Sequence, residues 1–163
     1  LLGLPYPGGP QISKKALKGN SQAIDFPRPM LNKDDFDFSF SGLKTAALYY
    51  WQKNKKVDIN DFCASFEQAI VDVLVGKTIK AIKKHNPQSI ILAGGVSANT
   101  KLRQTLAKEI KKINPNLKFL TPDIKYSMDN AAMIAVAGYY KAKNKNFTNW
   151  QEIIADPNWK LYV

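Results

Sequence analysis

The 163 residues carry 24 Lys and Arg against 13 Asp and Glu, so the formal net charge is +11 and the pI is about 9.7. Hydrophobic residues make up 45% of the chain, enough for a folded core, and no apolar run reaches the roughly 18 residues that a membrane span needs. With one cysteine and one histidine, the chain excludes an internal disulfide and a Cys/His zinc site built from its own side chains. The charge favours a polyanionic partner such as nucleic acid, and we expect a cytoplasmic protein without a membrane partner.

The first 57 residues are predicted to form a turn-rich opening segment with one short strand and two helices. Glycines between prolines disfavour regular structure at the start. Alternating aromatic and polar residues have the two-residue period of a half-buried strand. The predicted elements are a turn over 1–10, a helix over 11–18 ending at Gly19, a strand over 36–42, and a helix over 42–53 capped by Ser41.

The segment 58–143 is predicted to be a long helix followed by a βαβα unit. Apolar residues recur at helical spacing, and short apolar runs mark two buried strands. The tail 144–163 carries Trp150 and Trp159 and is predicted to pack back on the body. The predicted elements are a helix over 59–85 capped by Asp58 or Asn60, a strand over 89–93, a helix over 99–113, a strand over 117–120, and a helix over 129–142 opened by Asp129.

The lone cysteine and the lone histidine have structural interpretations. Cys63 falls within the apolar pattern of the long helix, which indicates a core residue rather than a nucleophile. His85 follows two lysines and precedes Asn86-Pro87, the signature of a helix C-terminus, where a partly cationic imidazole is favoured.

The segment GGVSAN at 94–99 lies between a predicted strand and a predicted helix. Gly94 and Gly95 let the backbone pass close to a ligand, and the unpaired N–H groups of the following helix suit a phosphate. Asn99 can donate and accept hydrogen bonds, as a nucleoside requires. The alternative is a packing turn in which Ser97 or Asn99 caps the helix.

Asp129 also has two interpretations. It precedes an alanine-rich helix in the segment YSMDN, where a carboxylate is a common N-cap. It also follows a strand, where α/β folds place metal or phosphate sites. One carboxylate cannot hold a metal alone, so the other ligands would have to come from elsewhere.

Four segments in order, YPGGP, DFSFSGLKT, GGVSAN followed by LR, and DNAAMIA, resemble the tRNA N6-adenosine threonylcarbamoyltransferase family, formerly known as O-sialoglycoprotein endopeptidases. The resemblance covers residues 1–142. It implies an α/β, helix-rich C-terminal part of an actin-like ATPase fold with a small incomplete sheet. It also implies transfer of a threonylcarbamoyl group from threonylcarbamoyl-adenylate to N6 of adenosine 37 in tRNAs that read ANN codons.

Within this resemblance, Gly9 and Asn99, with Gly94 and Gly95 beside Asn99, match the nucleotide-binding positions, and Asp129 matches a metal ligand. Ser127-Met128 stand where the family commonly has Cys-Thr. The family's metal is iron or zinc, one divalent ion per subunit, and its two histidine ligands belong to an N-terminal lobe that this chain lacks. The implied partners are tRNA, threonylcarbamoyl-adenylate or ATP, and accessory subunits of the modification machinery.

Two alternatives remain open from the sequence. The chain could belong to an actin-like ATPase or carbohydrate kinase, since a Gly-Gly turn and an acidic helix start occur there too, although DFSFSGLKT argues against it. It could instead be a non-catalytic module that docks tRNA or partner subunits. In the transferase interpretation, residues 1–163 are a C-terminal lobe fragment that is expected to be inactive alone.

Overall fold

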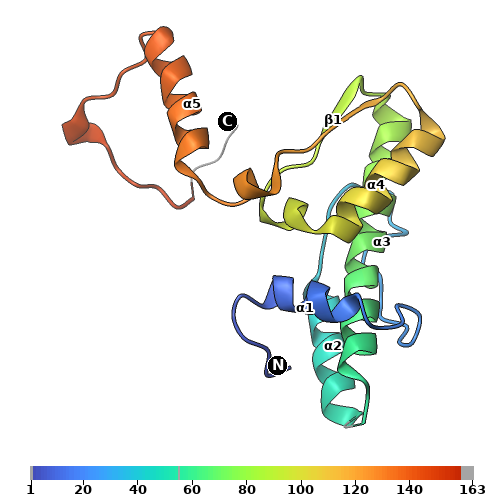
Figure 1. Ribbon diagram of the computed structural model, residues 1–163. Coiled ribbons are helices and arrows are strands. Elements are labelled where there is room, and N and C mark those ends of the chain that lie inside the picture. Colours follow the sequence, from blue (N-terminus) through green and yellow to red (C-terminus); the bar gives the residue numbers. More distant parts are fainter. Residues whose placement is uncertain (1, 55, 159–163) are drawn as a thin grey trace. The chain divides into compact units, whose positions relative to one another are not determined.

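The computed structural model describes residues 2–54 and 56–158, and contacts divide the chain into two compact units, Leu1–Ser127 and Met128–Val163. The larger unit is built around one long helix, α3 (Ile59–His85) (Figure 1). The Asp58 side chain caps α3 by accepting hydrogen bonds from the first-turn amides, and Asn86, in the left-handed conformation, ends it. The predicted long helix, its cap and its end are therefore confirmed.

Three apolar clusters of described residues lie along α3, two beside its first half and one beside its second half. Helix α2 (Ser41–Lys53) packs on the first half, where Leu43 and Phe62 are buried. Helix α4 (Thr100–Ile113) packs on the second half through one apolar stripe. Its buried residues are Leu102, Leu106 and Ile110, the i, i+4, i+8 positions of an amphipathic helix. The short helix α1 (Gly8–Ala16) lies beside Cys63, which is buried as predicted, and burial raises the pKa of its thiol.

A small parallel sheet lies at the end of the second half. Strand β1 (Ser89–Ile91) pairs with β2 (Lys118–Leu120), and Ile90 lies opposite Phe119. The order β1, α4, β2 confirms the predicted strand–helix–strand unit, and the described part of the chain is helix-rich with a two-stranded parallel sheet.

The predicted opening turn was wrong in part, because α1 begins at Gly8 rather than at residue 11. The first four N–H groups of a helix have no partner within the helix, so Pro10 loses no hydrogen bond in the first turn. The helix also ends earlier than predicted, with Leu17 rather than Gly19 as C-cap.

The predicted strand over 36–42 was also wrong. Residues 36–40 have no strand partner among the described residues, and α2 begins at Ser41, with Phe40 rather than Ser41 as N-cap. The aromatic alternation has another cause: Phe36 packs against His85, and Phe38 stacks on Phe40 with ring centroids 6.4 Å apart. Alternating residue types reflect the two faces of an extended backbone, and an extended segment can exist without a neighbouring strand.

The loop before α2 is held to α3 by a buried lysine. Lys77 is 1% exposed, forms an ion pair with the Asp35 carboxylate, and donates to the Asp35 carbonyl at 2.9 Å. The hydrogen bond from Lys77 holds the pKa of the Asp35 carboxyl below its usual range. The loop thus satisfies an ammonium that would otherwise be buried without a counter-charge.

Gly19 is required by close packing, and we expect Gly19→Ala to destabilise the chain by about 2–3 kcal/mol. A Cβ there would lie 2.1 Å from the carbonyl oxygen of Asn60, so the backbone of one segment must move. Gly42→Ala is the matched control, because its Cβ would meet only a Pro29 side-chain atom at 3.9 Å. Alanine suits a helix better than glycine, so the control should be neutral or slightly stabilising. Chemical denaturation measures both, and equal effects would contradict this explanation.

The smaller unit contains α5 (Ala131–Lys143) and a short 3-10 turn at Trp150–Glu152. Its apolar side chains are exposed, including Ile134, Tyr139 and Trp150, which is 77% exposed. The expected packing of the tail 144–163 on the body stays a prediction, and Trp159 lies outside the described residues. None of the helices that the structure describes combines the length and apolar character needed to cross a bilayer.

Candidate nucleotide-binding site

The GGVSAN segment forms a tight connection between β1 and α4. Gly94 has a φ of 87°, a conformation that favours glycine, and residues Gly95–Ala98 form one 3-10 turn. The Ser97 amide donates to the Gly94 carbonyl at 2.9 Å, and the Asn99 amide donates to the Val96 carbonyl at 3.0 Å. Gly94 and Gly95 are exposed, so their backbone is accessible to a ligand, as the prediction requires.

Asn99 is the N-cap of α4. Its Oδ1 accepts a hydrogen bond from the Leu102 amide at 2.8 Å. The capping interpretation left open by the sequence is therefore confirmed, but it does not account for the other half of the side chain.

The side-chain nitrogen of Asn99 joins two other helices. Nδ2 donates to Glu67 Oε1 on α3 at 2.7 Å and to Ser13 Oγ on α1 at 3.1 Å. The Ser13 hydroxyl donates to the same Glu67 oxygen at 2.6 Å. Glu67 is only 8% exposed, so this polar cluster of Ser13, Glu67 and Asn99 is largely shielded from water. We call it the Asn99 cluster.

The Asn99 cluster brings two of the predicted nucleotide-binding segments close together. Gly9 lies four residues before Ser13 on α1, one helical turn away along the same face. Ser13 contacts Asn99 directly, so α1 brings the PGGP segment into the neighbourhood of the GGVSAN turn (Figure 1). Gly9 is exposed, and a Cβ there would meet no atom within 4 Å.

The DFSFSGLKT segment reaches the PGGP segment through an apolar groove. Lys44, on the first turns of α2, and Gly8, at the start of α1, both line this groove. Its other lining side chains are apolar: Leu2, Leu4, Ile12, Ala47, Phe62 and Phe66. Three of the four family-like segments are thus neighbours in the larger unit.

Arg103 fixes the other side of the GGVSAN turn. Its Nε donates to the Ser97 carbonyl, and one terminal nitrogen donates to Ser127 Oγ at 3.1 Å. Ser97 and Ser127 are both buried, and their hydroxyls are 3.2 Å apart. The Arg103 side chain therefore holds the turn against the segment that follows β2.

Sequence reasoning missed three polar residues of this region: Ser13, Glu67 and Ser127. Glu67 lies in the most apolar stretch of α3, where an acidic residue among buried positions is a usable signal of a polar contact. No comparable signal marked Ser13 or Ser127, because their partners are 86 and 30 residues away in the chain.

Asp129 belongs to the smaller unit and is exposed. The helix begins at Ala131, and its cap is Asn130, whose Oδ1 accepts from the Met133 amide at 3.0 Å. The prediction that Asp129 opens and caps this helix was therefore wrong. The described residues contain no group of three His, Cys, Asp or Glu side chains that could hold a metal ion.

Comparison with known proteins agrees with the resemblance seen in the sequence. The family model for tRNA N6-adenosine threonylcarbamoyltransferase matches residues 1–136. A protein of that name from Desulfotalea psychrophila is 53% identical over 148 residues, covering 86% of this chain and 42% of the relative. Proteins of the same name from Thermosipho africanus and Thermosipho melanesiensis are 46% and 50% identical, each covering 99% of this chain and 48% of the relative.

The chain therefore spans about half the length of these relatives, and the match runs through all four segments that carried the resemblance. The chain belongs to the tRNA N6-adenosine threonylcarbamoyltransferase family.

Proposed function

We propose that this chain is the C-terminal part of an enzyme with an actin-like ATPase fold. In this proposal the full-length enzyme transfers a threonylcarbamoyl group from threonylcarbamoyl-adenylate to N6 of adenosine 37 in tRNA. The observation that carries the proposal is the Asn99 cluster, in a chain whose relatives bear that activity as their name. The cluster ties the helix that holds Gly9 to the turn that holds Gly94, Gly95 and Asn99. These residues form part of the adenylate-binding site in this proposal.

The proposed metal site is only partly supplied by the described residues. The exposed Asp129 carboxylate suits a divalent ion such as iron or zinc, whereas His85 lies at the end of α3 against Phe36. A bound metal would polarise the carbamoyl-adenylate toward attack by the adenosine amine. The described residues do not make a complete metal site by themselves.

We expect the isolated 163-residue chain to be inactive as a transferase and the full-length protein to be active. The reason is that the chain has one histidine, His85, and that its described residues do not supply a complete set of metal ligands. The assay measures threonylcarbamoylation of an ANN-reading tRNA with the adenylate supplied, so that accessory subunits are not needed to make the donor. Modification by the isolated chain would contradict the division of the site, and an inactive full-length protein would contradict the proposed function.

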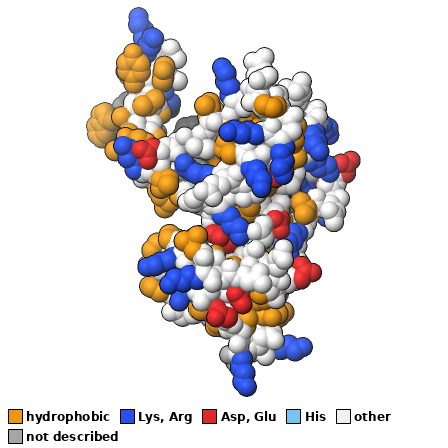
Figure 2. Space-filling view, turned by 45° about the vertical axis from the view of Figure 1, so that its right-hand side comes forward, with side chains coloured by type: hydrophobic (Ala, Val, Ile, Leu, Met, Phe, Trp, Pro, Cys, Tyr) orange, Lys and Arg blue, Asp and Glu red, His pale blue; other side chains and the backbone are white. Residues whose placement is uncertain are grey.

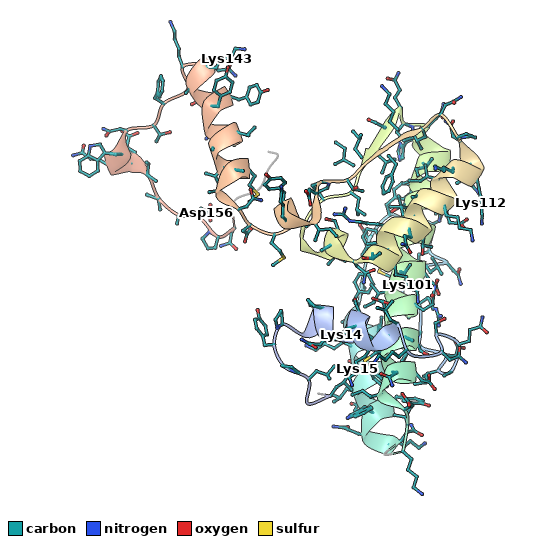
Figure 3. All side chains as sticks on the ribbon, viewed as in Figure 1. Lys14, Lys15, Lys101, Lys112, Lys143 and Asp156 are labelled. Carbon is teal, nitrogen blue, oxygen red and sulfur yellow. The ribbon has the colours of Figure 1, made fainter. Side chains whose placement is uncertain are left out.

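The charge distribution supports tRNA as the substrate. Between Gly76 and Ser127 the sequence has eleven Lys and Arg against two Asp and Glu, so most of the net charge of +11 arises there. Figure 2 shows Lys and Arg side chains crowded on the upper part of the larger unit, and in Figure 3 Lys101 and Lys112 mark the two ends of α4. Some lysines are neutralised, for example Lys80 by Asp34 and Lys112 by Glu109. Others have no acidic partner among the described residues, and we call these the basic surface: Lys83, Lys101, Lys108, Lys111 and Lys118.

We expect replacing Lys108, Lys111 and Lys118 by Gln in the full-length protein to weaken tRNA binding and to flatten its salt dependence. Each lost phosphate contact removes a counterion-release contribution, about one unit of the slope of log K against log salt. A matched variant with Lys14, Lys53 and Lys56 replaced by Gln loses the same charge from exposed sites on other elements. Equal slopes for the two variants would show that net charge alone, rather than the basic surface, attracts the tRNA.

A further inference from the structure

The hydrogen bonds of the Asn99 cluster fix which way the amide of Asn99 points. The Leu102 amide can only donate, so the atom it meets at 2.8 Å must be Oδ1. An ionised carboxylate can only accept, so the atom that meets Glu67 Oε1 at 2.7 Å must be Nδ2. A flipped amide would set like groups against each other on both sides, and the orientation is therefore unambiguous.

Asn99 Nδ2 meets two acceptors that are themselves 2.6 Å apart, so both lie on one side of the nitrogen and share one of its two hydrogens. One hydrogen-bond partner is Glu67 and the other is Ser13. Oδ1 has two lone pairs and uses one for the cap, so one lone pair remains for a ligand. A ligand can therefore donate a hydroxyl or amine to this lone pair of Oδ1 without breaking the cluster, and the second hydrogen of Nδ2 is also available to an acceptor.

Glu67 is the centre of this arrangement. Its Oε1 accepts from both Ser13 and Asn99, and it comes from α3, the longest and most deeply packed helix of the larger unit. A carboxylate that is 8% exposed must be satisfied by hydrogen bonds, and charge-assisted hydrogen bonds of this kind are the strong ones. Glu67 thus supplies the hydrogen-bond acceptor that α3 offers to Asn99 Nδ2.

We propose that Glu67 is a positioning residue, whose buried carboxylate orients the Asn99 amide so that Oδ1 receives a hydroxyl or amine of the nucleoside part of the substrate. The inference rests on the proposed function, because it assumes that Asn99 contacts the nucleotide. Glu67 itself acts through Asn99 and touches no substrate.

The experiment uses the full-length protein with ATP and adenosine as probes, and it measures Kd by calorimetry well below the melting temperature. Glu67→Met removes the acceptor, and Glu67→Asp keeps the charge but shortens the side chain by one methylene. Both should raise Kd about tenfold, the effect of losing one charge-assisted hydrogen bond. Glu67→Gln keeps an acceptor carbonyl and should stay within about twofold of the wild type. The increase should be the same for ATP and adenosine.

Glu109→Met is the matched control, since Glu109 lies on α4 and pairs with the exposed Lys112. It should leave both Kd values unchanged. An unchanged Kd for Glu67→Met and Glu67→Asp, with only a lower melting temperature, would overturn the proposal and leave Glu67 as a structural tie. In an Asn99→Ala background Glu67→Met should have no further effect, and additive losses would also overturn it.

A separate readout distinguishes this inference from the proposed function. If the wild-type protein binds neither probe, the proposed function fails, and the side-chain amide signal of Asn99 in a ¹H–¹⁵N spectrum then tests the positioning. Glu67→Met should move that signal and speed its hydrogen exchange, whereas Glu67→Gln should preserve its protection. Unchanged signals in Glu67→Met would show that Glu67 does not orient Asn99.

Discussion

Replacing Asn99 by alanine in the full-length protein is expected to weaken ATP or adenylate binding by about 1–3 kcal/mol and to lower the melting temperature as well. The affinity loss follows from removing the Oδ1 acceptor and leaving a nucleoside donor unpaired. The stability loss follows from removing the cap of α4 and the hydrogen bonds to Ser13 and Glu67.

The two effects are no longer alternatives. From the sequence, a lower melting temperature with unchanged affinity would favour the capping interpretation, but the structure shows that the cap exists in any case. A fall in melting temperature therefore carries no information about the ligand. Only the affinity, measured on folded protein, tests whether Asn99 contacts the nucleotide.

The control for this experiment is a second cap far from the Asn99 cluster. Asp58 caps α3 through the amides of Asn60 and Asp61, and α4 packs on the other half of α3. Asp58→Ala should destabilise the protein without changing the Kd for ATP. An Asn99→Ala protein that binds ATP as tightly as the Asp58→Ala protein would remove Asn99 from the proposed site.

The larger helices were predictable because their signals are local. Residues close together in the sequence encode each of these signals: the apolar spacing of α3 and α4, the Asp58 cap and the Asn86-Pro87 end. Such patterns can be recognised within one element, without knowing which other elements pack against it. The errors fell where local patterns were ambiguous, at the Gly-Gly-Pro start of α1 and the aromatic alternation before α2.

The candidate site was predictable only in part. Gly94, Gly95 and Asn99 were indicated by the local strand–turn–helix pattern, Gly9 came from the resemblance to a family, and the structure places Asn99 in contact with the helix that carries Gly9. Glu67 and Ser13 could not be assigned to Asn99 in advance, because the partners are 32 and 86 residues apart. Such contacts depend on how α1, α3 and α4 pack, which no local pattern specifies.

Replacing Asp129 by asparagine is expected to have little effect on the isolated chain and a large effect on the full-length protein. In the isolated chain the thermal stability should hardly change, because Asn130 and not Asp129 caps α5, and Asp129 is exposed. In the full-length protein the substitution should lower the metal affinity by at least about 10–100-fold, the loss typical even for outer partners of a metal site. Transferase activity should fall with the metal content.

The physical reason is the loss of a charged oxygen. Asparagine keeps the size and one carbonyl oxygen of aspartate but not its negative charge, which strengthens the coordination of a divalent ion. Asp123→Asn is the matched control, since it removes one exposed carboxylate that pairs with Lys125 and leaves Asp129 intact. Metal content by elemental analysis and tRNA modification are measured on the same preparations. Full metal occupancy and activity in the Asp129→Asn protein would show that this carboxylate is not a ligand, and that the metal is held by residues outside this part of the chain.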